Sequence, residues 1–174
     1  ASIDNALMAG VRSIEHASLL EERTANQMAK QGAFMVPTLL IGERLSQGTE
    51  AQGVNEFSKQ KLSGLRAQVP ISVELAAQTG VSIASGSDLL WPHQSGRGEQ
   101  LAFLADIIGP MAAIVSATRT NAQLFGLDDR IGTVEEGKEA DLIAVAGDPL
   151  ADIRLLRDSS NVRLVLKGGK IVKD

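Results

Sequence analysis

Two side chains with metal-binding chemistry follow strand-like segments of this sequence. The strand-like segment at 11–14 ends at Glu15-His16, and the one at 81–85 ends at Gly86-Ser87-Asp88. In parallel βα folds the functional groups collect at the carboxyl ends of the strands. An imidazole and a carboxylate at one such edge suit a divalent cation such as zinc. The carboxylate can also take a proton from a water that the metal has made more acidic.

The neighbouring positions offer weaker candidates. The intervening run at 33–36 ends at Pro37-Thr38 and supplies no strong ligand. Trp91, in the loop after Asp88, either forms the base of a substrate pocket or packs against the rest of the loop. His93, in the same loop, either lines that pocket or is exposed to solvent. We therefore keep Trp91 and His93 as candidate substrate-binding residues.

His16 and Asp88 each have an ordinary structural role available as well. A single histidine beside a strand is more often a hydrogen-bonded structural residue than a ligand. An aspartate in the position of Asp88 can cap the helix or turn that follows it. Their joint placement at equivalent points of two βα units favours a site, and the structural alternatives stay open on spacing alone.

The elements that would position these residues follow a repeated pattern. Three helix-like segments end at Gly10, Gly32 and Gly80, and an apolar strand begins at once after each glycine. This alternation predicts βα units and a parallel sheet. Ser18 with Glu21 fits a capping box at the start of the next helix. Residues 40–69 read as a loop followed by a helix, either a lid or a plain surface excursion.

After Gly126 the sequence no longer shows helix-like segments and predicts strands and turns instead. The segment "ADLIAVAGDPL" predicts a strand ended by a turn, and "NVRLVLKGGKIV" predicts a hairpin with Gly168-Gly169 at its tip. We predict a domain boundary here, between a βα part at 1–126 and a small β part at 127–174.

Composition excludes several classes of function. The 174 residues carry a net charge of -4, which argues against nucleic-acid binding, and they contain no cysteine for a disulfide or a thiolate metal site. The apolar runs are too short to span a membrane. The segment "ASIDNALMAG" reads as the last turns of a helix, so we expect the chain to begin inside a fold.

Several motifs, in order along nearly the whole chain, carry a family resemblance. With "GVRSIEHA", "GVSIASGSD" and "GTVEEGKEADLIAVAGDPLADI", the chain resembles the C-terminal part of the amidohydrolase superfamily, most closely its imidazolonepropionase-like branch with prolidase-like dipeptidases. The resemblance implies a metal-dependent hydrolase on a (β/α)8 barrel, with a small β-sandwich built from both chain ends. The chain would then be an α/β fragment that holds strands six to eight of the barrel and part of the sandwich.

The resemblance also implies roles for individual residues. His16 matches the metal-binding histidine after the sixth strand of the barrel. Asp88 matches the aspartate after the eighth strand, which binds metal and shuttles protons to and from the hydrolytic water. Gly-Ser-Asp stands here where many relatives have Gly-Thr-Asp, and the loop around His93 departs from the common form.

The family's site needs further ligands that this chain does not contain. It also uses a His-x-His pair, often a carboxylated lysine, and another histidine, all of which would precede Ala1. We expect the parent to bind one or two divalent ions, with zinc the expected metal, and to hydrolyse an amide-like C–N bond in a dipeptide, a cyclic amide or a related small molecule. This chain alone should be inactive and bind metal weakly, because catalytic zinc normally takes three protein ligands and a water.

The expected partners follow from the same incompleteness. The missing N-terminal half, or a partner chain, would complete the site, and exposed sheet edges predict a homo-oligomer. The alternative is a non-catalytic domain that uses this edge to bind or assemble with a partner chain.

Overall fold

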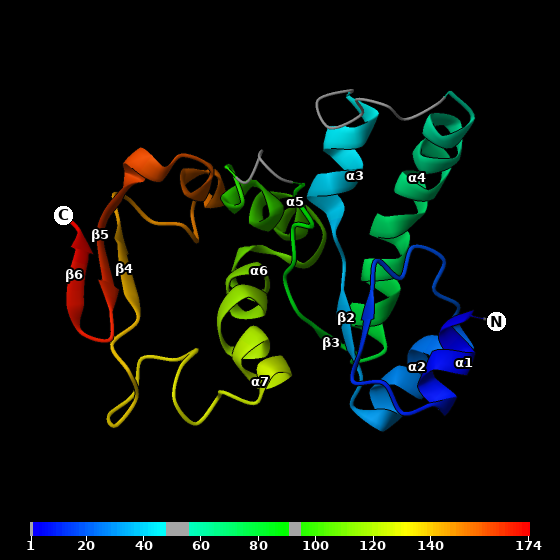
Figure 1. The fold of residues 1–174 in the computed structure, drawn as a ribbon, viewed down its shortest axis with the longest axis horizontal. Helices are drawn as coiled ribbons and strands as arrows, with labels where there is room; N and C mark the ends of the chain where they lie inside the picture. The colour runs from blue at the N-terminus through cyan, green and yellow to red at the C-terminus, as the bar shows by residue number, and fades with distance from the viewer. Residues whose placement is uncertain (1, 48–55, 91–94) are drawn as a thin grey trace. The chain divides into compact units, whose positions relative to one another are not determined.

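The computed structural model describes residues 2–47, 56–90 and 95–174, which form two compact units at Ala1–Ser95 and Gly96–Asp174 (Figure 1). Each unit contains a sheet of three strands. The boundary that we predict at 126/127 falls inside the second unit, and it stays a prediction about the domains of the parent protein.

The first unit alternates helices with short strands. In chain order its elements are α1 (Ser2–Met8), β1 (Ser13–Glu15), α2 (Glu22–Gln31), β2 (Phe34–Val36), α3 (Leu39–Ser46), α4 (Glu56–Gln78) and β3 (Ser82–Ile83). The strands lie in the order β1-β2-β3 and all run parallel, with Ile14 opposite Met35 and Met35 opposite Ile83. The parallel sheet predicted from the helix–strand alternation is confirmed.

A glycine turn leads from a helix into each of these strands. At Gly32 the backbone is left-handed (φ 67°), and the N–H of Ala33 donates to the carbonyl of Met28 at 2.9 Å. Gly10 and Gly80 make the same turn, with positive φ and equivalent backbone hydrogen bonds. This is the Schellman ending of a helix, which glycine adopts without steric cost. The predicted helix ends are confirmed at all three positions.

The core of the first unit lies between the sheet and its helices. The side chains of β2 are buried, and apolar residues from α1, α2 and α4 are buried with them. The almost fully buried members of this core are Leu7, Ala25, Met28, Ala33, Met35, Leu40, Val73, Ala76 and Ala84. Burial of this kind, at about 25 cal/mol per Å² of apolar surface, fixes the strands against the helices and so fixes where each strand ends.

The capping box predicted at Ser18 is wrong. Helix α2 begins at Glu22, and its N-cap residue Glu21 makes no side-chain cap hydrogen bond. A buried hydroxyl from α4 serves the turn before the helix instead, since Ser72 Oγ accepts from the N–H of Leu20 at 3.1 Å and donates to the carbonyl of Ser18 at 3.0 Å. A long-range tertiary contact has therefore replaced the local cap that the spacing suggested.

The insert after β2 is more helical than its composition suggests. Residues 39–46 form α3 where we predict a loop, and α4 confirms the predicted helix and contains Pro70 within it. Helices α3 and α4 lie side by side (Figure 1). The part of the insert at 48–55 lies outside the described residues.

The second unit combines a long helical stretch with an antiparallel sheet. Its helices are α5 (Gly98–Ile108) and a continuous run made of α6 (Pro110–Val115), a π-helical turn (Ser116–Thr120) and α7 (Asn121–Phe125). Its strands are β4 (Leu142–Val145), β5 (Val162–Lys167) and β6 (Lys170–Lys173), with short 3-10 helices at Ile153–Arg157 and Ser159–Asn161. The predicted hairpin with Gly168-Gly169 at its tip is confirmed, since β5 and β6 pair in antiparallel fashion.

A carboxylate fastens this hairpin to the residue before β4. Asp141 accepts a hydrogen bond from the N–H of Gly168 at 2.7 Å and pairs with the ammonium of Lys167. The hydrogen bond from Lys167, followed by the one from Gly168, lowers the pKa of Asp141 below its ordinary value.

Within the described residues, no helix is both long and apolar enough to cross a membrane.

Candidate functional site

His16 stands at the carboxyl end of β1 and is exposed, so it is not a core histidine. Its backbone N–H continues the parallel ladder by donating to the carbonyl of Val36 at 3.0 Å. Its φ is +63°, and that of Ala17 is +48°. Residues other than glycine rarely adopt this conformation, which costs about 1–2 kcal/mol, and such strain clusters at functional sites.

The side chain of His16 is held from the neighbouring strand end. Its Nδ1 lies 2.6 Å from Oγ1 of Thr38, which follows β2. Thr38 is also the N-cap residue of α3, where a threonine side chain usually bonds a backbone N–H and contributes about 1 kcal/mol, yet it makes no cap hydrogen bond here. The sequence predicts no role for Thr38, and the one available signal is its position between two candidate strand ends.

Asp88 follows β3 at the same end of the sheet. It is exposed, and its φ is +53°. The structural alternative was a capping role, but within residues 2–47, 56–90 and 95–174 its carboxylate has no hydrogen-bond or ion-pair partner. Aspartates of the second unit show what capping looks like in this protein, since Asp152 and Asp158 each accept a backbone N–H at 3.0 Å and 2.8 Å. Asp88 is thus a strained, available carboxylate.

The backbone before Asp88 packs closely on the end of β2. A Cβ added to Gly86 would lie 2.8 Å from Cγ1 of Val36 and 4.0 Å from Cγ2 of Thr38. A side chain at this position would therefore force Val36 or the backbone to shift. The end of β2 therefore lies between His16 on one side and Gly86 on the other.

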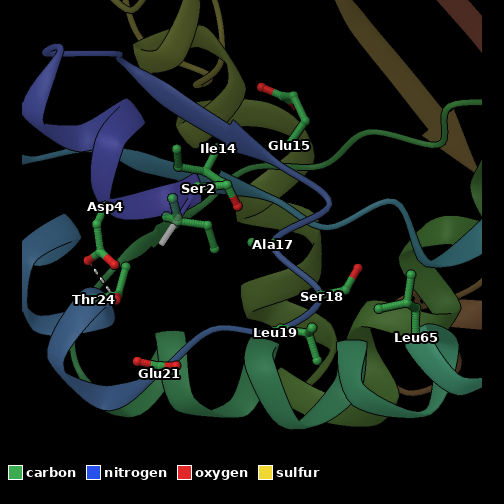
Figure 2. Close-up of a pocket in the computed structure, with 11 residues that line it drawn as sticks. Ser2, Asp4, Ile14, Glu15, Ala17, Ser18, Leu19, Glu21, Thr24 and Leu65 are labelled. Atoms are coloured by element: carbon green, nitrogen blue, oxygen red, sulfur yellow. Dashed lines mark hydrogen bonds between the residues drawn. The ribbon is translucent and has the colours of Figure 1, made fainter.

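A pocket of about 380 Å³ lies beside β1. Its lining runs from the start of α1 along the end of β1 and the turn at 17–21 to Leu65 of α4 (Figure 2). Asp4 faces Thr24 across a hydrogen bond in this pocket and also pairs with Arg23 at 2.8 Å. His16 is not among the lining residues, although its neighbours Glu15 and Ala17 are, so the pocket reaches the end of β1 without including the imidazole.

The remaining candidates are not brought into the site. Trp91 and His93 lie outside the described residues. Within the part of the chain that the structure describes, no three histidine, cysteine, aspartate or glutamate side chains are grouped to hold a metal ion. Two donor residues, His16 and Asp88, follow the two outer strands of one parallel sheet.

The sequence around these strand ends matches a known protein family. The amidohydrolase family model matches residues 1–172. The chain belongs to the amidohydrolase family. The motifs that suggested the resemblance, Ile-Glu-His and Gly-Ser-Asp, are those at the carboxyl ends of β1 and β3.

Individual amidohydrolases are similar to this chain over nearly its full length. Ochratoxinase of Aspergillus niger is 31% identical over 174 residues, which are 99% of this chain and 36% of that protein. The crystal structure of a prolidase complexed with N-methylphosphonate-L-proline matches with a TM-score of 0.93 at 33% identity, covering 99% of this chain and 42% of the other. A Xaa-Pro dipeptidase with bound methionine in its active site matches with a TM-score of 0.88 at 32% identity, again over 99% and 42%.

The chain therefore spans well under half the length of these amidohydrolases. Imidazole and carboxylate are donors that suit zinc and other divalent ions. The two donors fit part of a metal site, because three protein ligands are the usual minimum for a catalytic zinc.

Proposed function

We propose that this chain is the C-terminal part of a metal-dependent amidohydrolase that hydrolyses an amide-like C–N bond with water. The observation that carries the proposal is the pair His16 and Asp88, which follow two strands of one parallel sheet, are exposed, and have positive φ. Family membership and the names of the similar enzymes support a hydrolase, and they do not favour the alternative of a non-catalytic domain.

The two residues take different roles in this proposal. His16 would bind a divalent ion, for which zinc is the expected choice, and the parent would hold one or two such ions. When bound, the ion lowers the pKa of water towards about 7, so that the water is a nucleophile at neutral pH. Asp88 contributes a ligand oxygen, takes the proton from the attacking water, and returns a proton to the leaving nitrogen.

The rest of the site would come from the polypeptide that precedes this chain in the parent. In this proposal β1, β2 and β3 are strands six to eight of a (β/α)8 barrel, and the second unit supplies part of a β-sandwich. Among the described strands β1 pairs only with β2, and the pocket lies next to β1. A preceding strand would add to that open edge and bring the other ligands with it.

The similar enzymes favour a dipeptide as the substrate. One of them is a prolidase and another a Xaa-Pro dipeptidase. The similarity to ochratoxinase supports another small molecule as the alternative substrate. A cyclic amide or a related ester remains within the same chemistry, because each presents a carbonyl carbon to water. In the full-length parent, Trp91 and His93 are proposed to line the substrate site.

The decisive experiment is Asp88→Asn in the full-length parent. Hydrolysis of a Xaa-Pro dipeptide should fall by about 10³-fold or more, since general acid–base groups contribute about 10²–10⁴-fold and a ligand oxygen is also altered. Circular dichroism and melting temperature should stay those of the wild type. Asp128→Asn, an exposed aspartate of the second unit, is the matched control and should keep full activity. Retention of most activity in Asp88→Asn would disprove the role.

The incompleteness of the site is tested separately on the 174-residue chain. We expect its zinc to be lost on dialysis against a chelator, and its oligomeric state to exceed a monomer because a sheet edge is open. Tightly bound, stoichiometric zinc in a monomer would contradict the proposal that the site is partial.

A further inference from the structure

The hydroxyl of Thr38 is used in an unusual way. Thr38 occupies the N-cap position of α3, where threonine is favoured because its hydroxyl bonds a backbone N–H of the first turn. In this structure it makes no such bond, and Oγ1 lies 2.6 Å from Nδ1 of His16 instead. Helix α3 therefore has no side-chain cap, and the hydroxyl of Thr38 bonds the exposed imidazole of His16 instead.

The backbone anchors His16 to the same place. Its N–H donates to the carbonyl of Val36 at 3.0 Å, so main chain and side chain are both fastened to the residues at the end of β2. This two-point attachment holds a residue whose φ is +63°. Strained backbone persists only where the surroundings over-determine it.

A neutral imidazole carries one proton, so a hydrogen bond at one nitrogen decides what the other can do. A histidine that binds metal through Nε2 keeps its proton on Nδ1 and donates it to a nearby acceptor. Within the described residues, Nε2 of His16 has no partner, while Nδ1 faces the hydroxyl of Thr38. The side-chain arrangement is that of a histidine prepared to offer Nε2.

We propose that Thr38 is a positioning residue for the hydrolytic site: its hydroxyl accepts the Nδ1 proton of His16 and so presents the lone pair of Nε2 to the metal. Thr38 itself contacts neither the metal nor the substrate. The inference rests on the proposed function, because it requires His16 to be a ligand. It also extends to the other side of Thr38, where Gly86 leaves room for the end of β2 next to the segment that leads to Asp88.

The test uses the full-length parent and two substitutions that separate the hydroxyl from the methyl group. Thr38→Val removes the hydroxyl and keeps the shape, whereas Thr38→Ser keeps the hydroxyl and removes Cγ2. Thr79→Val is the matched control, because that hydroxyl bonds the carbonyl of Leu75 within α4, away from His16.

Two readouts other than activity are measured on each protein. In metal-free protein labelled with ¹⁵N-histidine, the ring nitrogen shifts report which nitrogen of His16 carries the proton. The resonances of His16 are those absent from His16→Asn. Competition with a chromophoric chelator gives the zinc dissociation constant. Melting temperature checks for a purely structural effect.

We expect Thr38→Val to move His16 away from the Nδ1–H form and to weaken zinc binding by about 10–100-fold. Its melting temperature should change little, since no helix cap is lost. Thr38→Ser and Thr79→Val should match the wild type in ring nitrogen shifts and zinc affinity. An unchanged proton position and a zinc affinity within twofold of wild type in Thr38→Val would overturn the inference.

Loss of zinc affinity in both Thr38→Val and Thr38→Ser, in step with a lower melting temperature, would also overturn it and assign Thr38 a packing role. Failure of the proposed function gives a different result. If His16→Asn keeps the zinc affinity of the wild type, His16 is not a ligand, whatever proton position the Thr38 variants show.

Discussion

The two ends of the parallel sheet carry the same backbone conformation on different residue types. At the amino end, where helices turn into strands, the positive φ falls on Gly10, Gly32 and Gly80. At the carboxyl end, it falls on His16, Ala17 and Asp88. Glycine adopts this conformation without a Cβ penalty, whereas other residues pay about 1–2 kcal/mol. The amino end therefore turns on glycine without strain, whereas the carboxyl end carries strained backbone at the two candidate site residues, His16 and Asp88.

The second unit sharpens this contrast. Within residues 96–174 every positive φ falls on a glycine. Beside its hairpin, the carboxylate of Asp141 is engaged by Lys167 and Gly168. Asp88 combines a positive φ with an exposed carboxylate that has no partner among the described residues, and no residue of the second unit that the structure describes shows this combination.

A steric clash introduced at the carboxyl end of the sheet should have a large effect on stability. In Gly86→Ala the new Cβ would lie 2.8 Å from Cγ1 of Val36, which is buried, so the free energy of unfolding should fall by about 1–3 kcal/mol. Urea denaturation measures this loss. Adding Val36→Ala should restore part of it, because that change removes the clashing atom. If the double variant instead loses the sum of the two single losses in free energy of unfolding, Gly86 and Val36 do not approach each other closely.

A reciprocal pair of substitutions tests the strain itself. Gly32→Ala meets no atom within 4 Å, so its whole effect is the left-handed backbone, and stability should fall by about 1 kcal/mol. Asp88→Gly should raise stability by up to about 1 kcal/mol, because it relieves the same strain and removes no buried contact, while activity is lost. Destabilisation by Asp88→Gly would remove the basis for contrasting the two ends.

The smallest effect concerns the structural carboxylate of the second unit. Since the pKa of Asp141 is lowered in the folded protein, its stabilisation is present above the unfolded value of about 3.9 and is lost as the pH falls through the lowered value. Asp141→Asn should therefore unfold at lower urea than the wild type at pH 7, and the two should converge in strong acid. Asp88→Asn, which loses no partner among the described residues, should unfold at the same urea concentration as the wild type at pH 7.

Local signals in the sequence predict much of this fold. The glycine turns, the three parallel strands and the hairpin at Gly168-Gly169 follow from backbone preferences that act within a few residues, and all are confirmed. Family membership is likewise confirmed, because the motifs that carry it are contiguous in the sequence. The roles of His16 and Asp88 in the chemistry stay predictions.

Contacts between distant segments are what the sequence does not reveal. The spacing of Ser18 and Glu21 fits a cap, but the hydroxyl of Ser72 serves that turn, and no local pattern announces a partner so far along the chain. Thr38 is missed for the same reason. Its hydroxyl has an obvious local use at the start of α3, and only the packing of β1 against β2 gives it a different one.

The hydrogen bond to the hydroxyl of Ser72 lets the amide hydrogen of Leu20 report on the contact between α4 and the turn after His16. The N–H of Leu20 is bonded to a side chain 52 positions away on α4, in the turn that follows His16. That amide proton can exchange with solvent only when this hydrogen bond opens, through motion of the turn, of the Ser72 side chain or of the helix. Its exchange rate in heavy water therefore reports how often the contact between α4 and the turn after His16 opens.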